Sequence, residues 1–125
     1  MNEHAHRGAV AEAKAMAKLT ELGHVCSVPT VHNARYDLVV DVRGTAHRVQ
    51  VKHGYFDKNG KFRVDLRGRN SYKGKEPYEA HEIDAFVVYN GMADECYWFW
   101  IDETPATGMK RDVDTYYEHD IRKKL

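Results

Sequence analysis

Two neighbouring valine-rich runs carry polar side chains that could together hold a metal ion beside a phosphodiester. Asp37 lies in the run 36–42, and Gln50 and Lys52 lie in the run 47–53, beyond a glycine-containing turn. Polar and apolar residues alternate in both runs, which is the period of a half-buried strand, and side chains two residues apart share one face. If the runs pair as a hairpin, a carboxylate, an amide and an ammonium converge on one polar patch.

Glu12 is a candidate fourth member of this patch. The segment 7–22 is composed of strong helix formers, and Gly23 after it is a helix stop signal. On helical spacing Glu12 shares an apolar stripe with Ala15 and Leu19, where a carboxylate needs compensation because burying an unpaired charge is costly. One interpretation puts Glu12 at the edge of the stripe, with its carboxylate in water or beside an arginine. Next to the other three polar residues, we favour a place for it in the patch.

The order and spacing of these motifs resemble the PD-(D/E)XK nuclease superfamily. Arg7-Gly8 and Glu12 stand on a first helix, Asp37 begins a second strand, and Gln50-Val51-Lys52 lies on the third. Within the superfamily the chain is most similar to the small group I intron homing endonucleases that carry Gln-x-Lys, and secondly to archaeal Holliday junction resolvases. The similarity spans roughly residues 7 to 101. Two departures are Tyr36, where the superfamily name has proline, and Gln50 in place of the second acid.

This resemblance implies metal-dependent hydrolysis of DNA. Asp37 would bind Mg²⁺ directly, with Mn²⁺ able to substitute, and Glu12 would bind the ion or hold a water on it. The Gln50 side-chain carbonyl and the Val51 main-chain carbonyl would complete the protein ligands, because Mg²⁺ takes oxygen ligands and keeps several waters. Lys52 would stabilise the charge that develops in the transition state, or position the nucleophile.

The charge of the chain is zero overall but uneven along it. Between residues 58 and 75 there are seven basic residues and one acid, Asp65. Such a stretch attracts phosphate, and its glycines and hydroxyl groups favour loops and neutral phosphate contacts. The alternative is a solvated loop whose charges only maintain solubility. The predicted DNA-binding residues are Arg7, Lys58, Lys61, Arg63, Arg67, Arg69, Ser71, Tyr72, Lys73 and Lys75.

The length of 125 residues and a hydrophobic share of 42% predict one globular domain covering residues 1–125. We expect an α+β, restriction-endonuclease-like fold with a mixed central sheet flanked by helices. A helical or turn segment is expected at 79–84 and a short helix at the end of the chain. The expected strands cover residues 25–31, 36–42, 47–53, 61–66, 85–89 and 96–101.

Other patterns restrict the class of protein. There is no apolar stretch of membrane-spanning length and no signal-peptide pattern, so we expect a soluble cytoplasmic protein. Two cysteines without CxxC spacing argue against a disulfide framework, and the histidines near Cys26 match no zinc pattern. The aromatic run 97–100 could stack on bases, but a core role is favoured for it.

Three functions fit these observations. The first is a Mg²⁺-dependent endonuclease acting on duplex or branched DNA. The second is a DNA-binding module that keeps the nuclease fold without cutting, and the third is RNA processing, because the chemistry at phosphorus is alike for both backbones. A subunit with one active site needs a partner copy to cut both strands, which predicts a homodimer or homotetramer.

Overall fold

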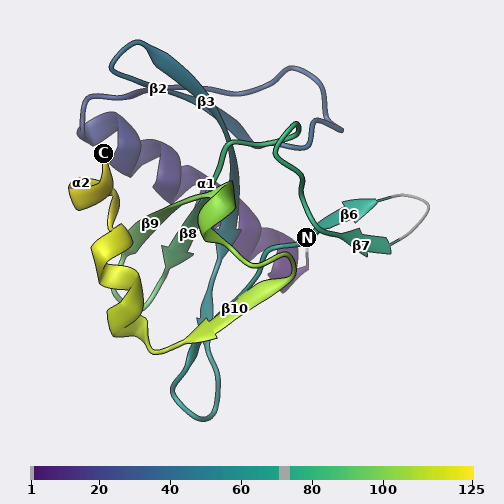
Figure 1. Cartoon of the computed structure of the whole chain (residues 1–125), viewed down its shortest axis with the longest axis vertical. Coiled ribbons are helices and arrows are strands. Elements are labelled where there is room, and N and C mark those ends of the chain that lie inside the picture. Colours follow the sequence, from purple (N-terminus) through teal and green to yellow (C-terminus); the bar gives the residue numbers. More distant parts are fainter. Residues whose placement is uncertain (1, 71–73) are drawn as a thin grey trace.

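The computed structural model describes residues 2–70 and 74–125. Its central sheet has the strand order β1-β2-β3-β8-β9 (Figure 1). Strands β3 and β8 are parallel and the other neighbours are antiparallel, so the expected α+β fold with a mixed sheet is confirmed. The strands are β1 (Val25–Ser27), β2 (Leu38–Val42), β3 (Thr45–His53), β8 (Ala85–Asn90) and β9 (Glu95–Trp100).

Two smaller sheets and four helical elements make up the rest of the described structure. A three-stranded sheet has the order β10-β5-β4, and β6 pairs with β7 in a two-stranded ribbon that projects from the body (Figure 1). These strands are β4 (Tyr55–Phe56), β5 (Phe62–Asp65), β6 (Gly68–Asn70), β7 (Gly74–Glu76) and β10 (Gly108–Arg111). The helical elements are α1 (Glu3–Glu21), the 3-10 helices η1 (Ile101–Glu103) and η2 (Val113–His119), and α2 (Ile121–Lys124). Within the described residues, no helix is long and apolar enough to cross a membrane.

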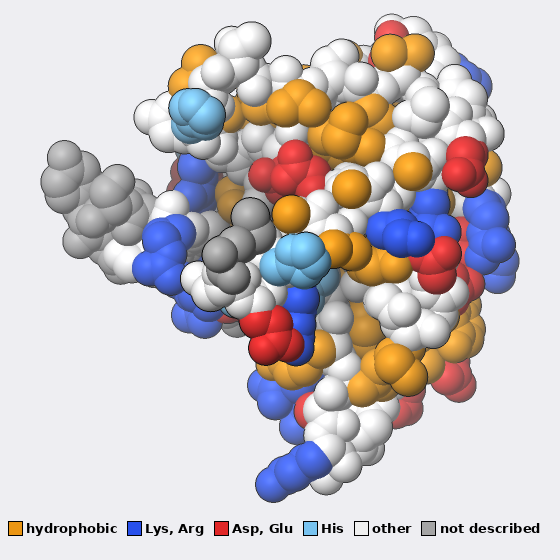
Figure 2. Space-filling view, turned by 180° about the vertical axis from the view of Figure 1, so that it is seen from behind, with side chains coloured by type: hydrophobic (Ala, Val, Ile, Leu, Met, Phe, Trp, Pro, Cys, Tyr) orange, Lys and Arg blue, Asp and Glu red, His pale blue; other side chains and the backbone are white. Residues whose placement is uncertain are grey.

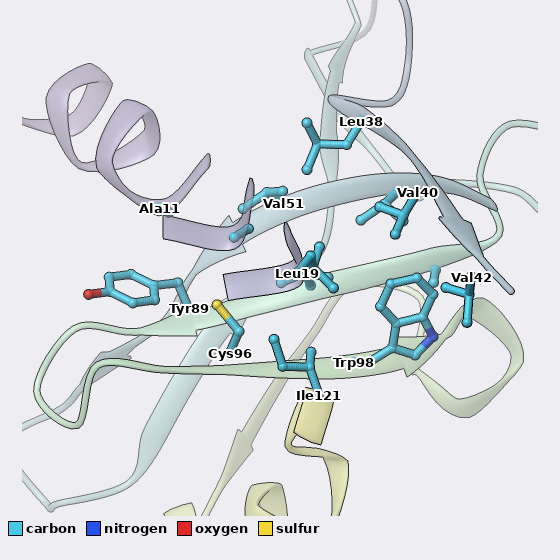
Figure 3. Packing of buried hydrophobic residues seen from close by; sticks show 14 residues of the cluster. Ala11, Leu19, Leu38, Val40, Val42, Val51, Tyr89, Cys96, Trp98 and Ile121 are labelled. Carbon is cyan, nitrogen blue, oxygen red and sulfur yellow. The ribbon is translucent and has the colours of Figure 1, made fainter. Parts of the chain in front are cut away.

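Each face of the central sheet has its own hydrophobic core. Helix α1 covers one face, where Leu19 belongs to one buried cluster with Val40, Val51 and Trp98 (Figure 3). On the other face, buried side chains of the small sheet and of η2 pack against those of β8 and β9. Strand β8 is buried on both sides, as its unbroken apolar run predicts. The core role expected for the aromatic run is confirmed, since residues 97–99 are fully buried.

Helix α1 begins at Glu3, four residues before the expected start. Asn2 is its N-cap and accepts a hydrogen bond from Ala5 N at 2.7 Å. Such a cap satisfies one of the free N–H groups at a helix start, so the helix extends back to it. At the other end, Gly23 takes φ +94, a left-handed conformation that glycine adopts without strain and that closes the helix as expected.

The hairpin that carries the polar patch forms as predicted. Strands β2 and β3 pair from Leu38↔Val49 to Val42↔Thr45, joined by Arg43 and Gly44. Both turn residues have positive φ, the backbone of the two-residue turns that match the twist of paired strands. The strand expected over 25–31 is shorter and ends at Ser27, because Pro29 has no N–H to continue a ladder.

The segment expected as a fourth strand, 61–66, is a strand outside the central sheet. It forms β5, the middle strand of the small sheet, between β4 and β10. The connection that follows it contains the β6–β7 ribbon, which its glycine-rich sequence did not predict. The segment 79–84 is a turn, and the short terminal helix is present as α2.

Candidate active site

Asp37 is held at the start of β2 by the neighbouring strand. Its N–H donates to Val49 O at 2.9 Å, and its Oδ2 accepts from Val51 N at 3.0 Å. Leu38, one residue later, points into the core beneath α1, so Asp37 lies on the opposite face. Gln50 and Lys52 alternate with buried Val49 and Val51 and share that face. The hairpin therefore brings together the carboxylate, the amide and the ammonium predicted from the sequence.

Glu12 reaches this patch from helix α1. It lies half-buried beside the stripe of Ala11, Ala15 and Leu19 that packs on the sheet. Burial raises the pKa of Glu12, and the negative charge of Asp37 raises it further. That electrostatic effect requires the two carboxyl groups to be near each other, although they are 25 residues apart in the chain, from 12 to 37. Glu12 therefore stands within electrostatic reach of Asp37.

Lys52 is half-buried with its ammonium fixed in place. Its Nζ donates to Arg67 O at 2.7 Å and lies 5.5 Å from the centre of the Tyr78 ring. Burial lowers the pKa of Lys52, while the carboxylates of Asp65 and Asp37 act in the opposite direction. The lysine is therefore oriented by main chain and by an aromatic face, and it stands within electrostatic reach of Asp37.

The donor set fits a divalent cation. Burial raises the pKa of Asp37, and the Val51 N–H and the Lys52 charge oppose that rise only in part. Of the described residues, none donates a hydrogen bond to Asp37 Oδ1, to the Glu12 carboxylate or to the Gln50 amide. Val51 can offer only main-chain atoms, because its side chain is in the core. Oxygen atoms in this combination suit Mg²⁺.

The predicted DNA-binding residues are spread over several elements. Arg67 and Lys75 share Asp65, Lys61 pairs with Asp112, and Arg7 pairs with Glu3 on its own helix. Arg63 is on β5, Arg69 is exposed on β6, and Lys58 is in the turn between β4 and β5. Ser71, Tyr72 and Lys73 lie outside the described residues. In the view from behind (Figure 2), Lys and Arg side chains lie on the side of the molecule that carries the β6–β7 ribbon, and others lie among acidic side chains on the opposite side.

A cluster beside Lys52 was not predicted. The Arg35 guanidinium lies 4.2 Å from the centre of the Tyr78 ring, and its Nε is 2.7 Å from Glu82 Oε2, close enough for an ion pair but not aligned as a hydrogen bond. Gly68 allows the ring to pack here, since a Cβ on it would lie 2.5 Å from Tyr78. The side chains come from two separate segments, because Tyr78 and Glu82 share the connection between β7 and β8 and Arg35 precedes β2. Only the closeness of Arg35 to Asp37 in the sequence could have indicated it.

A group of possible metal ligands lies elsewhere, between β7 and β8. Glu79, His81 and Glu82 form this group. In the described part of the chain, these are the three His, Cys, Asp or Glu residues whose possible ligand atoms lie close together. Glu82 is already paired with Arg35, and Glu79 with His81. Protein side chains therefore already engage all three of these groups, and Cys26 is not among them.

Comparisons with known proteins agree with this geometry. A family model described as PD-(D/E)XK endonuclease matches residues 1–120. Among solved structures, the chain is similar to a bacterial homing endonuclease, I-Ssp6803I, with a TM-score of 0.75 and 26% sequence identity, over 87% of this chain and 78% of that chain. No curated protein sequence matches. Members of the matched family typically use a divalent metal ion. Because the family model covers nearly the whole sequence and the acid–amide–lysine patch stands on its expected elements, the chain belongs to the PD-(D/E)XK endonuclease family, whose members hydrolyse phosphodiester bonds.

Proposed function

We propose that the chain is a metal-dependent DNA endonuclease whose catalytic residues are Glu12, Asp37, Gln50 and Lys52. The observation that carries this proposal is the pairing of two half-buried carboxyl groups, each with a raised pKa, beside an oriented ammonium. Burial is the main cause of both raised pKa values, and repulsion by Asp37 adds to it at Glu12. A bound cation would favour the ionised form of both groups, and perturbed groups of this type cluster at functional sites. Similarity to a homing endonuclease supports DNA as the polymer.

Each residue has a distinct task in this proposal. Asp37 uses Oδ2 to accept the Val51 N–H, which orients the carboxylate and leaves Oδ1 to bind Mg²⁺, or Mn²⁺ in its place. Glu12 would bind the ion or accept a hydrogen bond from the attacking water, and the Gln50 and Val51 carbonyls would complete the protein ligands. The bound ion supplies polarisation of the phosphate and a lower pKa of the attacking water.

Lys52 acts on the charge of the reacting phosphate. Its ammonium is fixed by Arg67 O and by the Tyr78 face, so no reorganisation is needed when negative charge develops. The cost of burying this cation appears as its lowered pKa, which Asp37 and Asp65 partly offset. Several basic residues stand near Lys52 on β5 and on the ribbon. We infer that they contact the backbone of duplex DNA, with branched DNA as the alternative substrate.

Cleavage assays test the proposed function. Purified protein with Mg²⁺ should cut duplex DNA or a four-way junction; chelation by EDTA should abolish the activity and Mn²⁺ should restore it. Cleavage of RNA with the matching sequence, measured in the same assay, shows whether DNA or RNA is the substrate. A protein that binds DNA but cuts none of these substrates, and that releases no heat when titrated with Mg²⁺ or Mn²⁺, is the non-cleaving module instead.

We also infer a homodimer or homotetramer. One subunit provides one active site, so cutting both strands of a duplex needs two copies arranged symmetrically on the DNA. Light scattering at micromolar protein should give a mass at least twice that of the 14.4 kDa chain. A monomer that still makes double-strand breaks contradicts this inference.

A further inference from the structure

The small sheet β10-β5-β4 has one apolar and one charged face. Phe62 and Val64 of β5 and Met109 of β10 are buried in the second core. The residues that alternate with them, Arg63 and Lys110, therefore point away from the core. They line a hollow of about 500 Å³ on the outer face, together with Tyr55, Arg67 and the main chain of Gly108.

Two cations stand directly opposite each other on this face. Lys110 pairs with Arg63 in the β10–β5 register, and Arg63 pairs with Tyr55 in the β5–β4 register. Like charges directly opposite across antiparallel strands are destabilising. The row of Tyr55, Arg63 and Lys110, here called the outer row, is also open to solvent: Tyr55 is 48% exposed and the Arg63 side chain 45%.

The carboxylates around the outer row do not balance its charge. Asp57 Oδ2 is 3.9 Å from Arg63 Nη1, but the Asp57 side chain is only 12% exposed and its Oδ1 accepts the N–H groups of Asn59 and Lys61. Asp65, on the same outer side of β5, is shared by two further cations, Arg67 and Lys75. Among the described residues, four cations, Arg63, Lys110, Arg67 and Lys75, thus meet two carboxylates.

A purely solvated face does not account for this pattern. Charges that only keep a surface in water are free to alternate in sign, which would stabilise the β5–β10 pairing instead of opposing it. A polyanion laid across the outer row would turn the repulsion between Arg63 and Lys110 into attraction for two adjacent negative groups. The neutral hydroxyl of Tyr55 is a third donor of the kind that contacts phosphate.

The outer row is directly connected to the catalytic lysine. The chain runs from Arg63 on β5 to Arg67, two residues beyond the end of the strand, and the carbonyl oxygen of Arg67 accepts the hydrogen bond from Lys52. Four residues of extended chain span at most about 13 Å. Each DNA strand carries one phosphate per roughly 3.4 Å of helix axis, so the outer row would meet a phosphate within about four nucleotides of the one beside Lys52.

We propose that Tyr55, Arg63 and Lys110 form a phosphate-binding subsite for the DNA backbone, separate from the scissile phosphate. This subsite rests on the proposed nuclease function, since it assigns a path for the same substrate. The subsite contributes affinity and register, and it takes no part in the chemical step. It extends the basic surface beyond the sequence segment 58–75, because Lys110 comes from a strand far along the chain.

Binding measurements on charge-neutralised variants test the subsite. Lys110→Gln and Arg63→Gln should each weaken binding of a fluorescent random-sequence duplex, measured by anisotropy in EDTA over a series of NaCl concentrations. The slope of log affinity against log salt should fall by about 0.9 for each phosphate that the protein no longer neutralises, and by about twice that in the double variant. With Mg²⁺, both variants should need more DNA for half-maximal cleavage, so the loss should appear in KM.

Lys123→Gln is the matched control. It removes the same charge from an exposed residue of α2, and it should leave the slope unchanged. The Lys110→Gln variant should be at least as stable as the wild type to heating, because it relieves the repulsion with Arg63, so weak binding cannot be ascribed to unfolding. Unchanged slopes in both single variants and the double variant overturn the subsite but leave the nuclease function standing. A wild-type protein that binds no duplex overturns both.

Discussion

Replacing Asp37 by asparagine should lower the rate of metal-dependent cleavage by on the order of 10²- to 10³-fold. The asparagine carbonyl can still accept the Val51 N–H that Asp37 Oδ2 accepts at 3.0 Å, so the start of β2 keeps its anchor. What the substitution removes is the negative charge next to Glu12 and Gln50. With only Glu12 left as an acidic ligand, a divalent cation should bind far more weakly.

Two measurements and one control decide this prediction. Cleavage under single-turnover conditions gives the rate, and calorimetric titration with Mn²⁺ gives the metal affinity; both should fall together in Asp37→Asn. The matched control is Asp41→Asn on the same strand, where the exposed carboxylate only accepts the Gly44 N–H in the turn at 2.8 Å. That variant should cut at the wild-type rate. If Asp37→Asn cuts equally well, Asp37 is not the metal ligand.

The Asp37→Asn variant should fold without difficulty in the absence of metal. Burial raises the pKa of Asp37 above its value in the unfolded chain. For a carboxyl group of this kind, the favourable contribution to folding is complete below the unfolded pKa and is lost as pH rises through the folded pKa. At neutral pH the ionised Asp37 therefore costs stability, and Asp37→Asn should unfold at the same or a higher temperature than the metal-free wild type.

Sequence patterns predicted the elements whose signals are local. The β2–β3 hairpin follows from alternating valines on either side of a Gly44 turn, and β8 follows from the unbroken run at 85–89. The same patterns predicted the polar patch, because a carboxylate on an apolar helix stripe and polar residues on a valine-rich strand need a reason to be there. Chemistry of that kind is visible in residue types and spacing.

Pairings between distant segments left no such signal. Strand β5 was predicted as a strand, but its partner β10 comes near the end of the chain, and only the three-dimensional fold sets Lys110 opposite Arg63. The contacts of Arg35 with Tyr78 and Glu82 join two segments across the active site in the same way. The early start of α1 is a different case, since the capping signal of Asn2 was present in the sequence.

Removal of the Lys52 ammonium should lower the cleavage rate about as much as Asp37→Asn does, and it should act on the chemical step. Lys52→Met keeps an unbranched side chain of similar length in the space beside the Tyr78 ring but removes the charge, and we expect kcat to fall by about 10²- to 10³-fold. The Arg67 carbonyl loses its donor, which costs on the order of 1–3 kcal/mol if the oxygen stays buried. Thermal unfolding of the variant measures that cost separately.

Comparison with two other variants identifies the role of the charge. Lys52→Arg retains a cation that can donate to Arg67 O, so it should recover part of kcat. A lysine whose charge plays no part in the chemical step would give the same kcat in both variants. Lys58→Gln neutralises an exposed lysine in the turn between β4 and β5, and it should weaken DNA binding while leaving kcat unchanged. The change at Lys52 should therefore appear in kcat, and the change at Lys58 should appear in the affinity for DNA. If Lys52→Met instead shows a wild-type kcat at saturating DNA, Lys52 serves binding alone and the catalytic assignment is wrong.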